Sequence, residues 1–305
     1  MIESIISHAI HLLSLSIDVV LNPQSRTSWV WLGITYAYVI FWFLSTGRPL
    51  KGIFSKDIYW HPSARMDYQL IVFNTSVIMP VVYLLLFTVP QLASSIAATL
   101  HLWFTAPDWH LSPLAFMAVC TITISLVDNF TYYWEHRLFH RVPFLWEFHK
   151  IHHSAEVMTP FTVLRKHPIE HLARYLRAGF TAAVTIGVIE FLFIDRFTMA
   201  MVLGFSVVML AYHIIGLSNL RHSHIWLSYG PSIEMWFMSP AQHQIHHSND
   251  PKHFDKNFGS YLSIWDRLYG TLYVTDKSPE PIEFGIEEKH RDLKSMYLMP
   301  FRPRS

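Results

Sequence analysis

The stretch His136–His153 reads HRLFHRVPFLWEFHKIHH and contains two histidine clusters, H-x-x-x-H and H-x-x-H-H. A second H-x-x-H-H lies at His243–His247, which reads HQIHH. Residues three or four apart on a helix share one face, so each cluster would present two or three imidazoles side by side. Imidazole suits iron, zinc, copper and nickel, and eight clustered histidines are too many for one ion. The spacing therefore predicts a site for two metal ions.

Other kinds of histidine site fit less well. Structural zinc sites are usually four-coordinate and rich in cysteine, and Cys120 is the only cysteine of the chain. Single histidines often fill polar interiors or cap helices, but three tight clusters are not typical of that role. The chain also has no paired E-x-x-H motifs, no H-E-x-x-H and no glycine-rich nucleotide-binding fingerprint. Reducing power for any redox chemistry would therefore come from another protein.

The composition indicates a membrane protein. Only 15% of the 305 residues are charged and 51% are hydrophobic, against roughly 25% charged in a typical soluble domain. The apolar stretch at residues 2–21 either crosses a membrane or lies on it, and Gln91–Phe104 is predicted to be a short re-entrant or broken segment. Five further stretches approach the length that crosses a hydrocarbon core: Trp29–Leu44, Leu70–Val89, Pro113–Trp134, Ala178–Ile194 and Thr198–Gly216.

Basic residues predict the orientation of these spans, because they gather in short cytoplasmic loops. Lysine and arginine are frequent in residues 48–65 and 135–177 and absent from residues 91–112. The last two spans would return the chain to the same side before the third cluster, so all three clusters would converge there. The expected fold is an all-α, multi-pass transmembrane helical bundle with a cytoplasmic helical cap that carries a histidine-rich dimetal site. A bacterial cytoplasmic membrane is favoured, with the endoplasmic reticulum as the alternative.

Five blocks in order carry a resemblance to a known family: DNFTYYWEHRLFH (128–140), LWEFHKIHHS (145–154), RKHPIE (165–170), SPAQHQIHHS (239–248) and DKNFGSYLSIWDRLYGT (255–271). Together they resemble the fatty acid hydroxylase family, also called the sterol desaturase family. The resemblance implies a membrane-embedded, histidine-ligated oxygenase that uses two non-haem iron ions, O2 and external electrons on a lipid C–H bond. It also implies a redox partner such as cytochrome b5 or a ferredoxin with its reductase, and no nucleic-acid partner is expected.

The resemblance also implies the metal ligands, which would be the catalytic residues. The family has a histidine about twenty residues before its last cluster, and His222 occupies that place. The implied ligands are His136, His140, His149, His152, His153, His222, His243, His246 and His247. Four further candidates are His167, His171, His213 and His224. Four carboxylates could accept the distal N–H of ligand rings: Asp128, Glu135, Glu147 and Glu170.

The remaining expectations concern boundaries and alternatives. Residues 1–127 are predicted to be a membrane-spanning region, 128–275 a catalytic region with two further spans, and 276–305 a peripheral tail. The NFG turn and the helix after it are expected to close beneath the site, with Trp265 and Tyr269 packed on a helix. Hydroxylation of a sterol, fatty acyl or related membrane lipid is favoured. A desaturase, an isoprenoid-ring hydroxylase and a non-redox divalent-metal transporter or sensor stay open as alternatives.

Overall fold

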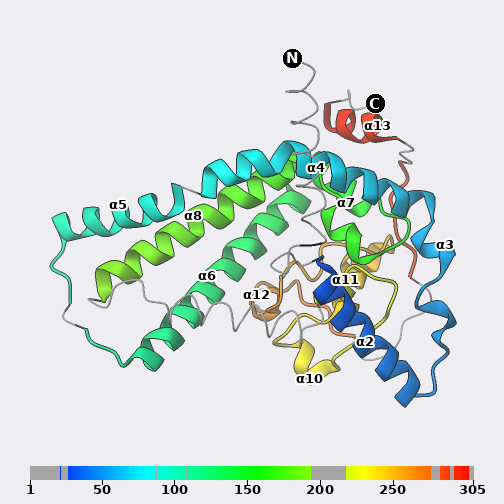
Figure 1. Ribbon diagram of the computed structural model, residues 1–305, viewed down its shortest axis with the longest axis horizontal. Coiled ribbons are helices and arrows are strands. Elements are labelled where there is room, and N and C mark those ends of the chain that lie inside the picture. The colour runs from blue at the N-terminus through cyan, green and yellow to red at the C-terminus, as the bar shows by residue number, and fades with distance from the viewer. Residues whose placement is uncertain are drawn as a thin grey trace.

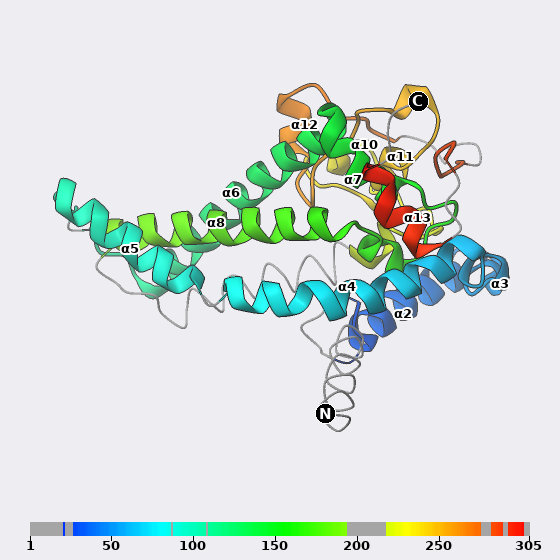
Figure 2. The same ribbon diagram turned by 90° about the horizontal axis from the view of Figure 1, so that it is seen from above.

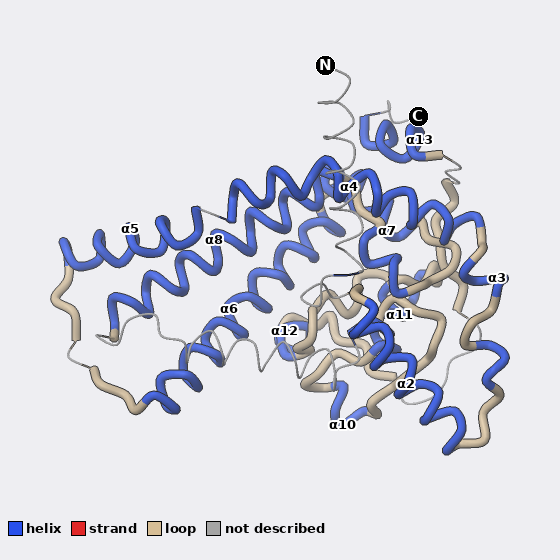
Figure 3. Tube along the Cα trace, in the orientation of Figure 1, coloured by secondary structure: helices blue, strands red, loops and turns tan. Residues whose placement is uncertain are grey.

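The computed structural model describes residues 21, 27–86, 88–107, 109–193, 218–275, 282–288 and 292–301. Helices and loops make up this part of the chain, and β pairing in it is limited to isolated bridges such as Phe237 with Leu262 (Figure 3). The all-α prediction is confirmed for these residues. His213, the predicted span Thr198–Gly216 and the stretch 2–21 lie outside them.

Three long helices extend together away from a more compact region, which we term the cap (Figures 1 and 2). They are α5 (Thr88–Trp103), α6 (Pro113–Arg141) and α8 (Pro168–Leu192), and α8 contacts both of the others. Gly187 lets α8 approach α5 closely, because a Cβ there would lie 2.6 Å from the Ala93 carbonyl oxygen. Phe116 and Cys120 of α6 pack on Ile189 and on Phe193 at the end of α8.

Within the described residues, α6 and α8 are the two helices long and apolar enough to cross a membrane. The predicted stretch Gln91–Phe104 lies in α5 except for its last residue, and α5 packs along α8. The predicted span Leu70–Val89 falls largely within α4 (Pro62–Leu86), and Trp29–Leu44 coincides with α2 (Trp29–Ser45). A multi-pass topology stays a prediction.

The cap consists of short helices and loops around the carboxyl end of α6. Its helices are α7 (Pro143–His153), η2 (Pro160–Leu164), η3 (Ser218–Leu220), α10 (Pro231–Glu234), α11 (Pro240–His246), η4 (Pro251–His253) and α12 (Ile264–Leu268). Against it lie α2, η1 (Leu50–Gly52), α3 (Lys56–Tyr59), α13 (Leu293–Leu298) and η5 (Met299–Phe301). Buried Val39 of α2 packs with Leu220, Ile225 and Leu227, whereas Met296 and Met299 pack on Met66 and Ile151.

The break between α6 and α7 folds the first two histidine clusters onto each other. Pro143 has no N–H and disfavours a helical conformation at the residue before it. Val142 is accordingly extended, with φ −94° and ψ 114°, so it ends α6 and precedes α7. The short connection turns α7 back against α6, which brings the H-x-x-H-H of α7 beside the H-x-x-x-H of α6.

Candidate metal centre

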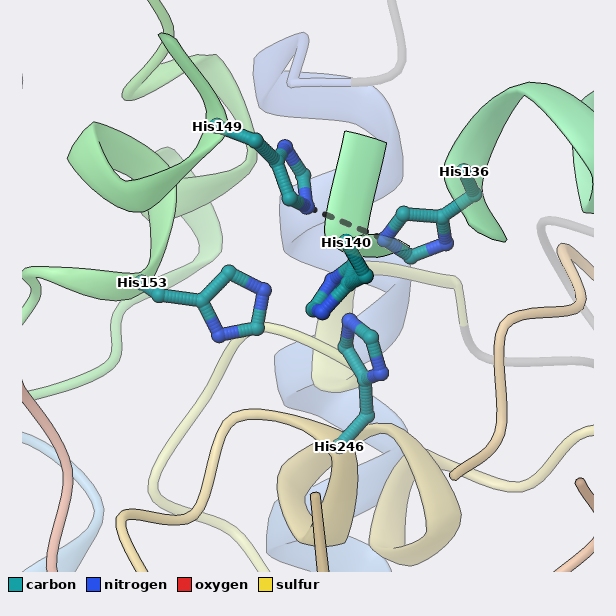
Figure 4. Close-up of side chains that lie close together, drawn as sticks. All are labelled: His136, His140, His149, His153 and His246. Carbon is teal, nitrogen blue, oxygen red and sulfur yellow. Dashed lines mark hydrogen bonds between the residues drawn. The ribbon is translucent and has the colours of Figure 1, made fainter. Parts of the chain in front are cut away.

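The nine predicted ligands gather in two adjacent groups. His136, His140, His149, His153 and His246 form the five-histidine group, and His152, His222, His243 and His247 form the four-histidine group. Within each group, one ring nitrogen of every histidine lies within 4.8 Å of the corresponding nitrogens of the others. Figure 4 shows the five rings of the first group converging on a common centre. The rings of His153 and His247 stack with centroids 4.4 Å apart, so the two groups lie side by side.

Helical periodicity explains how each H-x-x-H-H supplies both groups. In α7, His149 and His153 are four residues apart and share a face in the five-histidine group, while His152 belongs to the other group. In the α11 motif the division is reversed, since His243 and His247 join the four-histidine group and His246 joins the five. Each of the two H-x-x-H-H motifs therefore contributes histidines to both groups.

Four of the rings are oriented by acceptors at Nδ1. His149 Nδ1 donates to Glu170 Oε1 at 3.0 Å, and Glu170 is fully buried. His136, His246 and His152 donate from Nδ1 to the carbonyl oxygens of Phe258 (2.8 Å), Lys256 (2.7 Å) and Arg165 (3.2 Å). A neutral imidazole has a single N–H, so the Nε2 atom of each of these rings keeps a lone pair. Such a fixed tautomer is the usual arrangement around metal-binding histidines.

The lone pairs of these rings fit a cation between them. His136 Nε2 lies 3.1 Å from His149 Nε2, and with both protons at Nδ1 the two atoms would repel each other unless a positive charge lay between. The Nε2 atoms of His140, His153, His246 and His247 are buried, and no described residue offers them a hydrogen bond. An unsatisfied buried polar atom costs about 1–3 kcal/mol, and a bound metal ion would remove that cost.

Burial keeps the cap histidines in the neutral form that binds metals. It lowers the pKa of His246 to about 3 and the pKa values of His152, His153, His243 and His247 well below their ordinary range. Burial also lowers the pKa of His149, against the opposing effect of Glu170. These rings are therefore neutral at pH 7 and need no deprotonation before they bind an ion.

The four-histidine group has one feature that distinguishes it. His222 Nε2 lies 2.9 Å from His243 Nε2 and 3.1 Å from His152 Nε2. Arg221 donates from Nη2 to His243 Nδ1 at 3.2 Å and to the Gly259 carbonyl oxygen at 3.0 Å. A guanidinium can only donate, so neutral His243 carries its proton on Nε2, opposite to His136 and His149. Binding a metal through this ring requires loss of that proton or a shift of Arg221.

The further candidate histidines that the structure describes lie outside both groups. His167 accepts from Ile169 N as the cap of α8 and donates from Nε2 to the Tyr297 carbonyl oxygen at 3.3 Å. His224 donates to the Gly52 carbonyl oxygen, and His171 stacks on Tyr175.

Of the four carboxylates expected to accept from ligand rings, Glu170 alone has such a ring as its described partner. Asp128 and Glu135 pair with Arg177, and Glu147 pairs with Lys150.

The NFG turn lies beneath the site, as expected from the sequence. Asn257 has φ 57°, and Phe258 supplies the carbonyl that holds His136. Buried Asp266 accepts from the backbone N–H of Phe258 at 2.8 Å and of Gly259 at 2.7 Å, a role that sequence reasoning did not assign. A Cβ at Gly259 would lie 2.4 Å from the Leu262 carbonyl oxygen, so this close turn requires glycine. Trp265 and Tyr269 pack on α6 through Phe130 and Tyr133, as predicted.

A cavity of about 1150 Å³ reaches the five-histidine group. His140, His153 and His246 line it, whereas His247 is its only contact with the four-histidine group. Trp146, Phe254, Phe284 and Ile286 give it an apolar part, and Glu156, Asp255, Glu283 and Glu287 give it carboxylates. No lysine or arginine is among the described residues that line it.

Two helices long and apolar enough to cross a membrane and two groups of buried imidazoles define the class of the molecule: a helical, histidine-rich protein with a candidate metal centre. Residues 121–271 match the model of the Fatty acid hydroxylase family, so the chain carries a fatty acid hydroxylase domain and the resemblance seen in the sequence is confirmed. All nine histidines of the two groups fall within this region.

Curated relatives support this assignment. An alkylglycerol monooxygenase of Danio rerio is 25% identical over 60% of this chain and 37% of its own length. An ornithine lipid hydroxylase of Rhizobium tropici is 30% identical over 63% of this chain and 51% of its own. A Delta(7)-sterol 5(6)-desaturase of Gibberella zeae is 29% identical over 50% and 37%. The chain thus spans about a third to a half of the length of these relatives. No solved structure matches.

Proposed function

We propose that this chain is an O2-dependent oxidoreductase that hydroxylates an unactivated C–H bond of a membrane lipid. The observation that carries the proposal is the pair of adjacent histidine groups, whose buried lone pairs converge on two centres. Two iron ions held there would supply the binding and reductive activation of O2. The names of the relatives, which include a monooxygenase and a lipid hydroxylase, support the same class of reaction.

The residues of the chain would hold the centre rigid and neutral. Glu170 and the carbonyls of Phe258 and Lys256 fix three rings of the five-histidine group, so the ligands are preorganised before an ion binds. Arg174 donates from Nε to Glu170 Oε1 at 2.9 Å and keeps that carboxylate in place. Electrons would come from a separate protein, such as cytochrome b5 or a ferredoxin with its reductase.

We place the substrate in the cavity beside the five-histidine group. Its apolar residues would contact the chain of a lipid, and its carboxylates would lie near the polar end. An anionic head group would meet like charge there, at a cost that Arg141, paired with Asp255 at 3.3 Å, would partly offset. We therefore propose a neutral or cationic head group. The enzyme would lie in a membrane with several spans and its histidine groups toward the cytoplasm, in a bacterium rather than in the endoplasmic reticulum.

Desaturation is the second candidate, since a Delta(7)-sterol 5(6)-desaturase is among the relatives of this chain. Removal of a second hydrogen in place of hydroxyl transfer would need no change in the ligand set. The mass of the product distinguishes the two outcomes.

The test is a product assay on protein purified in detergent and supplied with ferrous iron, a reductant, labelled O2 and a mixed lipid extract. We expect the wild type to bind two ions per chain and to produce a lipid that gains one labelled oxygen, and we expect His149→Ala to keep about one ion and to lose that product. His224→Gln is the matched control, since His224 is near His222 in sequence and outside both groups. A lipid that loses two hydrogens would make the protein a desaturase. Two bound ions without O2 consumption across a broad lipid panel would overturn the oxygenase and favour a non-redox metal binder.

A further inference from the structure

Arg165 is a charged side chain buried in the cap, with only 2% of its surface exposed. Its guanidinium donates to the Ile151 carbonyl oxygen at 3.0 Å from Nε, to Ser154 Oγ at 3.0 Å from Nη2, and to Ser63. Its counter-ion is fully buried Asp67, whose Oδ1 lies 2.8 Å from Arg165 Nη1. Thr162 donates to the second oxygen of Asp67 at 2.7 Å. The buried pair is therefore enclosed in hydrogen bonds, as such pairs must be to persist.

The contacts of Arg165 converge on the end of α7 that carries metal-binding rings. Ile151 and Ser154 immediately flank His152 and His153, so the guanidinium fixes the backbone on both sides of these histidines. The backbone carbonyl of Arg165 also accepts from His152 Nδ1 at 3.2 Å. One residue thus sets both the position of the helix end and the tautomer and angle of the His152 ring.

Asp67 belongs to α4, at a distance of 98 residues along the chain and outside the region 121–271 that matches the family model. Without its charge, the Arg165 guanidinium would be buried without a counter-ion, and it would have to move toward water. The Arg165 carbonyl and the end of α7 would move with it. The five-histidine group would be affected less, because His149 is held by Glu170 and His136 by Phe258.

We infer that Asp67 is a positioning residue of the metal centre, which acts through Arg165 to orient His152 in the four-histidine group. This inference rests on the proposed function insofar as the groups bind metal. Its consequence is that the second ion depends on a residue outside the family domain, so the domain alone does not complete the site.

The test measures metal binding by the full-length chain, with Co²⁺ as the probe and folding followed by circular dichroism. For Asp67→Asn we expect the affinity for one of the two ions to fall by about 10–100-fold, as for other residues that orient ligands, with the other ion retained. Asp57→Asn is the control, because Asp57 is an exposed carboxylate at the start of α3. His152→Ala identifies the ion concerned, and Asp67→Asn added to His152→Ala should weaken that ion little further.

The possible failures are distinguishable. A wild-type chain that does not bind two ions contradicts the proposed function itself. A wild-type chain with two ions, and an Asp67→Asn chain with both affinities unchanged or both reduced equally, overturns the inference alone. If Asp67→Asn does not fold, Thr162→Val serves instead, since it keeps the ion pair and removes one of its hydrogen bonds. The same ion should then be weakened by a smaller factor, and unchanged affinity for it would overturn the inference.

Discussion

The two histidine groups both take rings from α7 and from the motif at α11, yet their surroundings differ. Three members of the five-histidine group line the cavity, and one member of the four-histidine group does so. A carboxylate, Glu170, orients the first group, whereas the second lies against the guanidinium of Arg221 and depends on the carbonyl of Arg165. A repeated ligand motif therefore does not imply equivalent ions. We expect the ion of the five-histidine group to meet small molecules from the cavity and the other ion to be more enclosed.

The largest expected effects come from removing one ligand of each group. His149→Ala and His222→Ala should each leave about one ion per chain and lower lipid oxidation by at least about a hundred-fold. The effect should be this large because removing a ligand weakens metal binding more than removing a residue that only orients a ligand. The remaining ions should differ in access. Azide added to the cobalt-loaded His222→Ala protein should shift its visible spectrum, since its ion faces the cavity. An equal shift in His149→Ala would show that the two centres are equally open.

Glu170→Gln should have the next largest effect, and on the five-histidine group only. The amide can still accept from His149, but it removes the buried negative charge beside the ring and leaves Arg174 without its described counter-ion. We expect the affinity for that group's ion to fall by about 10–100-fold, measured by competition with a chelator. Glu147→Gln is the control, because Glu147 pairs with Lys150 and belongs to neither group. Equal loss of both ions would contradict the inference that different residues hold the two groups in place.

The stability of the fold should depend on pH through Asp266, which holds the turn that contacts His136. Burial raises the pKa of Asp266 to about 6, against an ordinary value near 3.8, so the folded chain binds this proton more tightly than the unfolded chain. Its contribution to stability is complete at low pH and is lost as the pH rises through about 6. When the pH falls from 7 to 5, the free energy of unfolding of the wild type should therefore rise by roughly 1 kcal/mol relative to that of Asp266→Asn. Denaturant unfolding of both metal-free proteins measures the difference, and parallel curves would contradict it.

The sequence predicts which histidines gather better than it predicts how they divide into two groups and which residues hold them. Clustered spacing and the family resemblance point to nine histidines, and the structure brings those nine together. The sequence could not show that His149 and His152 belong to different groups. Both lie on one short helix, and the group that each joins depends on the histidines that face it from other segments. The sequence also could not predict the pairing of Asp67 with Arg165, since no periodicity links residues so distant in the chain. The helical class followed from apolar stretches, whereas the packing of α5 along α8 depends on Gly187, which no local pattern marks.

The smallest expected effect tests whether the cavity beside the five-histidine group selects the charge of the substrate. Glu283 and Glu287 are exposed carboxylates in its wall. Exposed charges are screened by salt, so replacing both with glutamine should change binding only a few-fold. We expect KM to rise for a lipid with an ammonium head group and to fall for one with a phosphate, with kcat unchanged for both. The contrast should shrink at high salt, since it is electrostatic. Glu288→Gln is the matched control, because Glu288 pairs with Lys150 and does not line the cavity. A KM that is unchanged for both lipids would mean that the head group stays outside this cavity, and that the four carboxylates serve only to offset the charge of the ions.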